Sequence, residues 1–116
     1  MMDNNVFIDL ATESLRKYGE LPSDFAEKMA KRIRRKFRVK LETEKINELA
    51  MHYKEIYTFG KSILQEHLSP SQGKYTSAAD VDTERFLANL KKKYPDEIRE
   101  IIQIAAGYVI YYEYLR

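Results

Sequence analysis

The segment from Glu27 to Lys40 has the residue types and the spacing of a phosphate-binding surface. It reads EKMAKRIRRKFRVK, and positions 28 to 40 hold eight Lys or Arg and no acid. Wound as a helix, the segment places apolar residues such as Met29 and Ile33 on one side. The rest of its surface carries seven cations that suit phosphate oxygens: Lys28, Lys31, Arg32, Arg34, Arg35, Lys36 and Arg38.

Such a surface repels itself unless anions neutralise it, because like charges four residues apart destabilise a helix. Outside positions 28 to 40 the chain holds 12 basic and 18 acidic residues. Three interpretations therefore stay open. The cations are solvated or paired with acids of other helices, they hold nucleic acid, or they meet an acidic protein or a membrane surface.

We take nucleic acid, DNA or RNA, as the leading partner, and an acidic protein as the alternative. The basic segment has no Asn or Gln to read base edges, so binding should depend on phosphates and discriminate weakly between sequences. Four to six cations in contact with phosphates predict a log–log salt slope of about −4 to −5 on duplex DNA. A helix-turn-helix is not indicated, since no tight turn followed by a base-reading helix is present.

No arrangement of residues typical of catalysis or metal binding is evident. The FGKS sequence at residues 59–62 lacks the first glycine of a phosphate-binding loop, because that position holds Glu55. Gly60 lies instead within an apolar stripe, where the missing side chain favours close approach of a partner helix. His52 and His67 have no acid three residues earlier, unlike the Glu-x-x-His pairs of helical metal sites. We expect no metal, no cofactor and no enzymatic activity, and a His67 bonded to a backbone carbonyl.

The C-terminal segment is rich in tyrosine. Nine of the 116 residues are Tyr, and positions 108, 111, 112 and 114 hold four of them. Both sides of a helix through this segment are apolar, which predicts a helix at the centre of a bundle or one shared with another molecule. We therefore expect a protein interface or a homodimer contact at Ile104, Ile110, Tyr111 and Tyr114.

Scarce Pro and Gly and a recurring helical periodicity predict an all-α protein, a single-domain bundle of about five helices. The expected helices cover residues 4–18, 23–37, 44–68, 79–94 and 96–115. Residues 37–42 alternate like a strand but have no partner strand, so an extended connector is expected there. The expected helix-end signals are Gly19 after the first helix, Ser23 and Thr43 as N-caps, Asp80 or Thr83 as the cap of the fourth helix, and Pro95 opening the fifth.

The apolar run from Ile101 to Leu115 is shorter than the ~20 residues that span a bilayer and contains Gln103 and Glu113, so no membrane insertion is expected. The absence of cysteine and of a secretory leader favours the cytoplasm. The leading hypothesis is a small non-enzymatic helical binding protein, accessory or regulatory, whose basic helix contacts nucleic-acid backbone. The alternative is a protein-binding module, such as an inhibitor, adaptor or assembly subunit. It would act through the tyrosine-rich C-terminal helix and use the basic face on an acidic partner.

Overall fold

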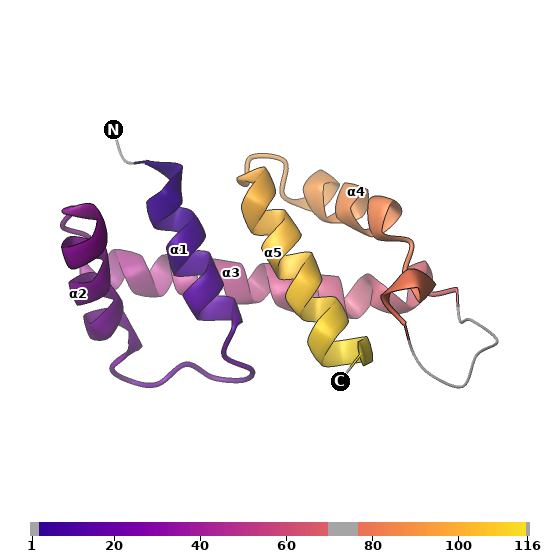
Figure 1. Ribbon diagram of the computed structural model, residues 1–116, viewed down its shortest axis with the longest axis horizontal. Helices are drawn as coiled ribbons and strands as arrows, with labels where there is room; N and C mark the ends of the chain where they lie inside the picture. The colour runs from indigo at the N-terminus through magenta and orange to yellow at the C-terminus, as the bar shows by residue number, and fades with distance from the viewer. Residues whose placement is uncertain (1–2, 70–76, 116) are drawn as a thin grey trace. The chain divides into compact units, whose positions relative to one another are not determined.

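The protein is all-α, as the sequence predicts. The computed structural model describes residues 3–69 and 77–115, and in these ranges it contains five α-helices and no strand. The helices are α1 (Asn4–Leu15), α2 (Phe25–Phe37), α3 (Thr43–Ile63), α4 (Thr83–Lys93) and α5 (Arg99–Ile110), shown in Figure 1. Short 3₁₀ turns, η1 (Leu64–His67) and η2 (Ala78–Asp80), precede α4, and a π-helical turn, η3 (Tyr111–Leu115), follows α5.

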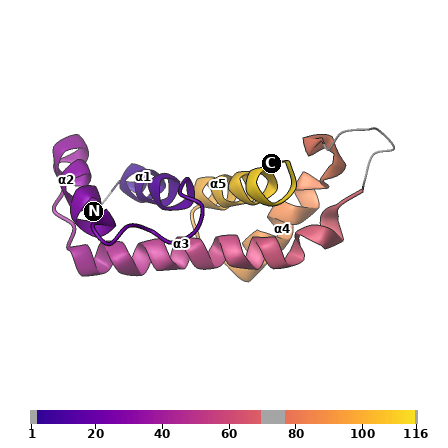
Figure 2. The same ribbon diagram turned by 90° about the horizontal axis from the view of Figure 1, so that it is seen from below.

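The chain divides into two compact units within α3. Unit 1 covers Met1–Lys54 and unit 2 covers Glu55–Arg116. The boundary lies inside α3 (Thr43–Ile63), which is labelled in Figure 2, so each unit contains a part of this helix. The expectation of one domain stays a prediction.

Unit 1 buries one side of α1, α2 and the first part of α3. The apolar residues recur every three or four positions, which turns a continuous stripe of each helix inward. Leu10, Ile33 and Ile46 represent the three helices in this core, and each is 0% exposed. Burial of one such side chain contributes roughly 1.5–3 kcal/mol, so the core holds α2 in one orientation.

Unit 2 packs the end of α3 against α4 and α5. Gly60 lies at the closest approach, where an added Cβ would be 3.1 Å from Val109 Cγ2 and 3.5 Å from Leu90 Cδ2. Phe86, Leu90 and Val109 are all 0% exposed. The predicted structural role of this glycine is confirmed, and the FGKS sequence lies inside a helix rather than in a loop.

The first helix ends earlier than expected. Its C-cap is Arg16, whose N–H donates to the carbonyl of Thr12 at 2.9 Å, so the predicted extension to Tyr18 is wrong. Tyr18 is 57% exposed and adds little burial that would favour another turn. Gly19 has φ +87°, a left-handed conformation that suits glycine, but it turns the linker rather than capping the helix.

The second helix begins at Phe25 with Asp24 as its N-cap, so the prediction of Ser23 is wrong. The Asp24 side chain makes no capping hydrogen bond. Its Oδ2 atom lies 3.0 Å from Lys28 Nζ instead. The competing ion pair explains why this carboxylate leaves the first backbone N–H groups without a side-chain cap.

The third helix begins at Thr43 itself, so Thr43 is not its N-cap, and regular α-helix ends at Ile63 rather than at residue 68. Beyond η1 the backbone pairs with a distant segment. The N–H of Asp82 donates to the carbonyl of His67 at 2.8 Å, and the N–H of Ser69 donates to the carbonyl of Asp80 at 2.7 Å. These bonds satisfy backbone groups that a longer helix would have satisfied. The connector at residues 38–42 has no strand, as expected.

The last two helices start at other residues than predicted. Asp82 caps α4 by accepting from the N–H of Arg85 at 3.3 Å, so neither Asp80 nor Thr83 is the cap. Asp80 is 4% exposed and has interior hydrogen-bond partners, described below. Pro95 lies in the turn between the helices, and α5 begins at Arg99 after the N-cap Ile98, so the predicted start near residue 96 is wrong.

Candidate functional site

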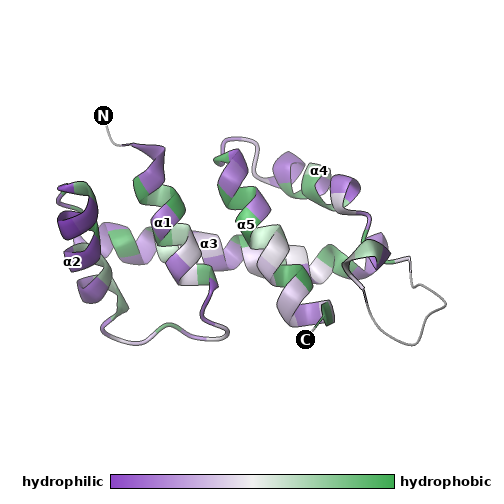
Figure 3. Cartoon of the chain, in the orientation of Figure 1, coloured by the Kyte–Doolittle hydropathy of each residue, from purple (hydrophilic) through white to green (hydrophobic). Residues whose placement is uncertain are grey.

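Helix α2 displays the predicted cations because its apolar residues fix which side faces inward. Phe25, Ala26, Met29 and Ile33 are buried, and the basic residues occupy the remaining surface. Figure 3 shows α2 as strongly hydrophilic. Three cations lie in its last turn, where positive charge is favourable next to the negative end of the helix dipole. This effect offsets part of the repulsion between them.

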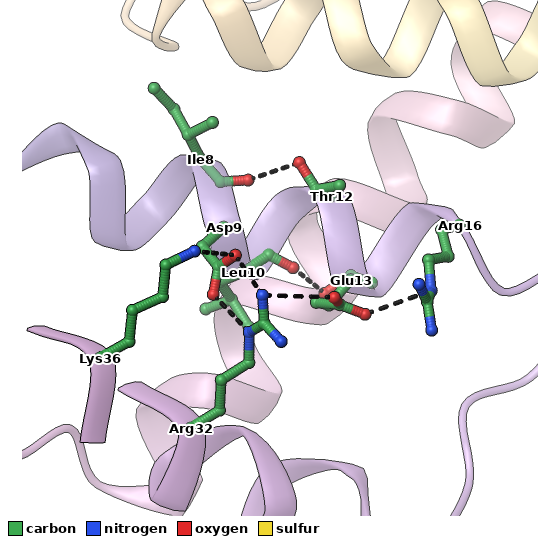
Figure 4. Close-up of polar contacts among 9 residues, drawn as sticks. Ile8, Asp9, Leu10, Thr12, Glu13, Arg16, Arg32 and Lys36 are labelled. Atoms are coloured by element: carbon green, nitrogen blue, oxygen red, sulfur yellow. Dashed lines mark hydrogen bonds and ion pairs between the residues drawn. The ribbon is translucent and has the colours of Figure 1, made fainter. Parts of the chain in front are cut away.

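Asp9 of α1 holds two of the seven cations. Its carboxylate accepts a bidentate pair from Arg32, with Nε at 2.8 Å and Nη2 at 3.0 Å, and a third contact from Lys36 Nζ at 3.4 Å (Figure 4). The Asp9 side chain is 12% exposed. Its hydrogen bond with the Arg32 guanidinium lowers the pKa of Asp9 below 3.8, and the charges of Arg32 and Lys36 act in the same direction. The pKa of Arg32 is raised in return.

A second acid of α1 and the N-cap of α2 extend this pairing. Glu13 lies with Oε1 3.7 Å from Arg32 Nη2 and with Oε2 3.2 Å from Arg16 Nε. Asp24 pairs with Lys28, as described above. We call Lys28, Arg32 and Lys36, which are spaced by four residues, the paired row, because an acid neutralises each of them.

The other four predicted cations form a separate row. Lys31, Arg34 and Arg35 are exposed on α2, and Arg38 is exposed at its C-cap, where its N–H donates to the carbonyl of Arg34 at 3.0 Å. None of the four side chains makes an ion pair or hydrogen bond with another residue in the described part of the chain. The spacing of Lys31, Arg34 and Arg35 places these three on one side of α2, and Arg38 follows at the C-cap with a left-handed backbone, φ 57°. We call Lys31, Arg34, Arg35 and Arg38 the open row.

The expected C-terminal interface is only partly exposed. Tyr111 is 53% exposed and Ile104 is half-buried, but Ile110 is only 9% exposed and therefore does not belong to an open face. Tyr114 donates a hydrogen bond of 2.6 Å to Oδ2 of the buried Asp80. The π-helical turn explains this position, because a wider turn rotates the side chains that follow it relative to an α-helix. Protein contact through these residues stays a prediction.

The buried His67 contacts another side chain of unit 2. His67 is 3% exposed, and its Nε2 lies 3.1 Å from the side-chain amide of Asn89, so the predicted carbonyl partner is wrong. Its Nδ1 atom has no hydrogen-bond partner among the described residues. Within residues 3–69 and 77–115, no group of three or more His, Asp or Glu is arranged to hold a metal ion.

Sequence reasoning found the cations but missed their partners. Asp9 and Glu13 are four residues apart on α1, which matches the four-residue spacing of Arg32 and Lys36 on α2. This matched spacing was the available signal, although it does not indicate which helices pack together. The bond between Asp80 and Tyr114 joins residues 34 positions apart and had no comparable signal.

In the part of the chain that the structure describes, no helix combines the length and apolar character needed to cross a bilayer. No family model, curated protein or solved structure matches this sequence.

Proposed function

We propose that the protein is a non-enzymatic binding protein that holds the phosphate backbone of nucleic acid on the open row of α2. The observation that supports this proposal most is the division of the basic surface into two rows. The paired row is neutralised by acids within unit 1, whereas Lys31, Arg34, Arg35 and Arg38 meet no acid among the described residues.

Repulsion between cations of the open row destabilises α2, and a bound polyanion would remove this repulsion. Lys31 and Arg35 are a like-charged pair at a spacing of four residues on α2. Such a pair destabilises a helix by roughly 0.2–0.5 kcal/mol. Phosphates placed along the row would convert this repulsion into attraction, and three of the four side chains are arginines, which bind phosphate oxygens bidentately.

The dimensions of the row fit a nucleic-acid backbone. From Lys31 to Arg35 the helix rises about 6 Å at 1.5 Å per residue, and Arg38 follows at the C-cap. Duplex DNA presents one charge per about 1.7 Å of its axis, so all four cations have a phosphate within reach. The exposed side of α2 offers no Asn or Gln to read base edges, and binding of this kind discriminates weakly between sequences.

A charge-matched pair of double variants tests the proposal. Arg34→Glu with Arg35→Glu reverses the centre of the open row, and Arg85→Glu with Lys92→Glu makes the same change in net charge on exposed positions of α4. We expect the first variant to weaken binding to a short random duplex roughly tenfold or more, because backbone contacts dominate such affinity. The second variant should bind like the wild type in the same polarisation titration.

Two results would contradict the proposal. Equal weakening by both variants would show that net charge alone governs the interaction, and unchanged binding by the first variant would show that the open row takes no part. Circular dichroism of each variant establishes that the helices are retained, since all four positions are exposed.

A further inference from the structure

A second surface, in unit 2, has features of a binding site and is separate from the basic helix. Helices α4 and α5 pack together, and a groove of about 310 Å³ remains between them. Ligand pockets in proteins are roughly 300–1,000 Å³, so the groove is large enough to accept a few side chains of a partner. Its lining comes entirely from these two helices.

The floor of the groove is apolar. Leu87 and Ala88 line it from α4 and Ile102 lines it from α5. Ile102 is only 2% exposed, Leu87 is half-buried, and Ala88 is exposed with no more than a methyl group to cover its neighbours. In Figure 3, α5 carries green hydrophobic bands among white and purple ones. The small side chain of Ala88 explains why the space between the helices stays open.

The rim of the groove carries more positive than negative charge. Lys91 and Arg99 line it together with a single acid, Glu84. The ammonium group of Lys91 donates to the backbone carbonyl of Glu97, which fixes its position without neutralising its charge. Arg99 makes no ion pair with another described residue. A ligand with an apolar side chain and neighbouring carboxylates would therefore match both the floor and the rim.

We infer that the groove between α4 and α5 docks an acidic segment of a partner protein. The segment inserts an apolar side chain over Leu87 and Ile102 and places carboxylates beside Lys91 and Arg99. Nucleic acid is a poor occupant because phosphates have nothing to bury against an apolar floor.

A pair of synthetic peptides tests the inference. One labelled peptide is an amphipathic helix of Leu and Glu, and the other has Lys in place of every Glu. We expect the full-length protein to bind the acidic peptide, and Ala88→Trp and Arg99→Glu each to weaken that binding roughly tenfold or more, as substitution at the centre of an interface does. Ala88→Trp fills the groove from an exposed position, and Arg99→Glu reverses the charge of its rim.

Two control variants assign the binding to this groove. Lys92→Glu makes the same charge change as Arg99→Glu on an exposed position of α4 that does not line the groove, and it should leave the affinity unchanged. Arg34→Glu with Arg35→Glu should also leave it unchanged, because those residues belong to the open row of α2. This control separates the inference from the proposed nucleic-acid function.

Several outcomes would overturn the inference. These are equal affinity for the two peptides, no binding of the acidic peptide at millimolar concentration, or a loss of binding only in the open-row variant. A dimer in sedimentation that Ala88→Trp dissociates would assign the groove to a second copy of the chain, and would overturn it as well.

Discussion

Asp9 determines which cations of α2 remain without an acidic partner in unit 1. Its bidentate bond with Arg32 and its contact with Lys36 cross from α1 to α2, and its side chain is largely shielded from solvent. Ion pairs of this kind stabilise more than pairs between fully exposed side chains because the geometry is fixed. One carboxylate therefore both fastens α2 to α1 and pairs with two cations that would otherwise belong to the proposed binding surface.

Replacement of this carboxylate should lower stability in a pH-dependent way. We expect Asp9→Asn to reduce the free energy of unfolding at neutral pH by about 1 kcal/mol, the upper end for partly exposed pairs. The pKa of Asp9 is lowered in the folded protein, so its contribution is present above the unfolded pKa and is lost as pH falls through the folded one. Urea unfolding at neutral pH and well below pH 3.8 should therefore show a difference that shrinks in acid. A difference of equal size at both pH values would contradict this role.

Substitutions at two glycines should change the stability of the protein in opposite directions, because the surroundings of the two residues differ. Gly107 is exposed in α5 with nothing within 4 Å of an added Cβ, so Gly107→Ala should stabilise the protein by about 0.5–1 kcal/mol. Gly60→Leu should destabilise it by about 1–3 kcal/mol, because the larger side chain overlaps with Val109 and Leu90. Thermal unfolding of both variants measures the contrast. Similar shifts in the two would mean that the helices do not approach closely at Gly60.

At the scale of helices, the sequence predicted which elements exist but not where they end. Apolar periodicity and scarce Pro and Gly were sufficient for five helices, because both are properties of neighbouring residues. The ends depend on which partner each polar group takes. Backbone groups of residues 67–69, beyond α3 and η1, pair with residues 80–82, whereas Asp24 at the start of α2 pairs with Lys28 four residues later. The choice between alternative partners is not visible in the apolar pattern.

The corrected N-caps lead to a prediction about helix stability. Asp82 accepts a hydrogen bond from the N–H of Arg85, so Asp82→Ala should cost about 1 kcal/mol, the usual value of a capping side chain. Ser23→Ala should have no measurable effect, since Ser23 lies outside the helix and is not its N-cap. Urea midpoints of the two variants compare them directly. The reverse order would restore the cap assignments expected from sequence.

The pairing of α1 with α2 also predicts how binding responds to salt. Asp9→Asn with Glu13→Gln removes both acids that hold Arg32 and Lys36, which raises the number of available cations from four to about six. We expect the log–log salt slope on duplex DNA to steepen from about −3.6 to about −5.4, since each phosphate contact contributes about −0.9. The measurement is a polarisation titration of wild type and variant at several salt concentrations. An unchanged slope would show that these two cations were never withheld by Asp9 and Glu13.

At the scale of the molecule, charge is divided between the two units. Residues up to Lys54 include 12 Lys or Arg and 9 Asp or Glu, whereas residues from Glu55 onward include 8 and 9. The net positive charge therefore lies in unit 1, which also carries the open row. The sequence revealed the basic segment, but only the packing of α1 on α2 divides its cations into a neutralised and an available set.

The salt dependence of binding by the unaltered protein tests the central claim most directly. A polarisation titration against a labelled random duplex and a labelled single strand, repeated over a series of salt concentrations, counts the phosphates that the protein neutralises. Four available cations predict slopes of about −3.6 on the duplex and about −2.8 on the single strand. No binding at low salt would contradict the claim, and a duplex slope near −6.3, about the value for all seven cations, would contradict the division into two rows.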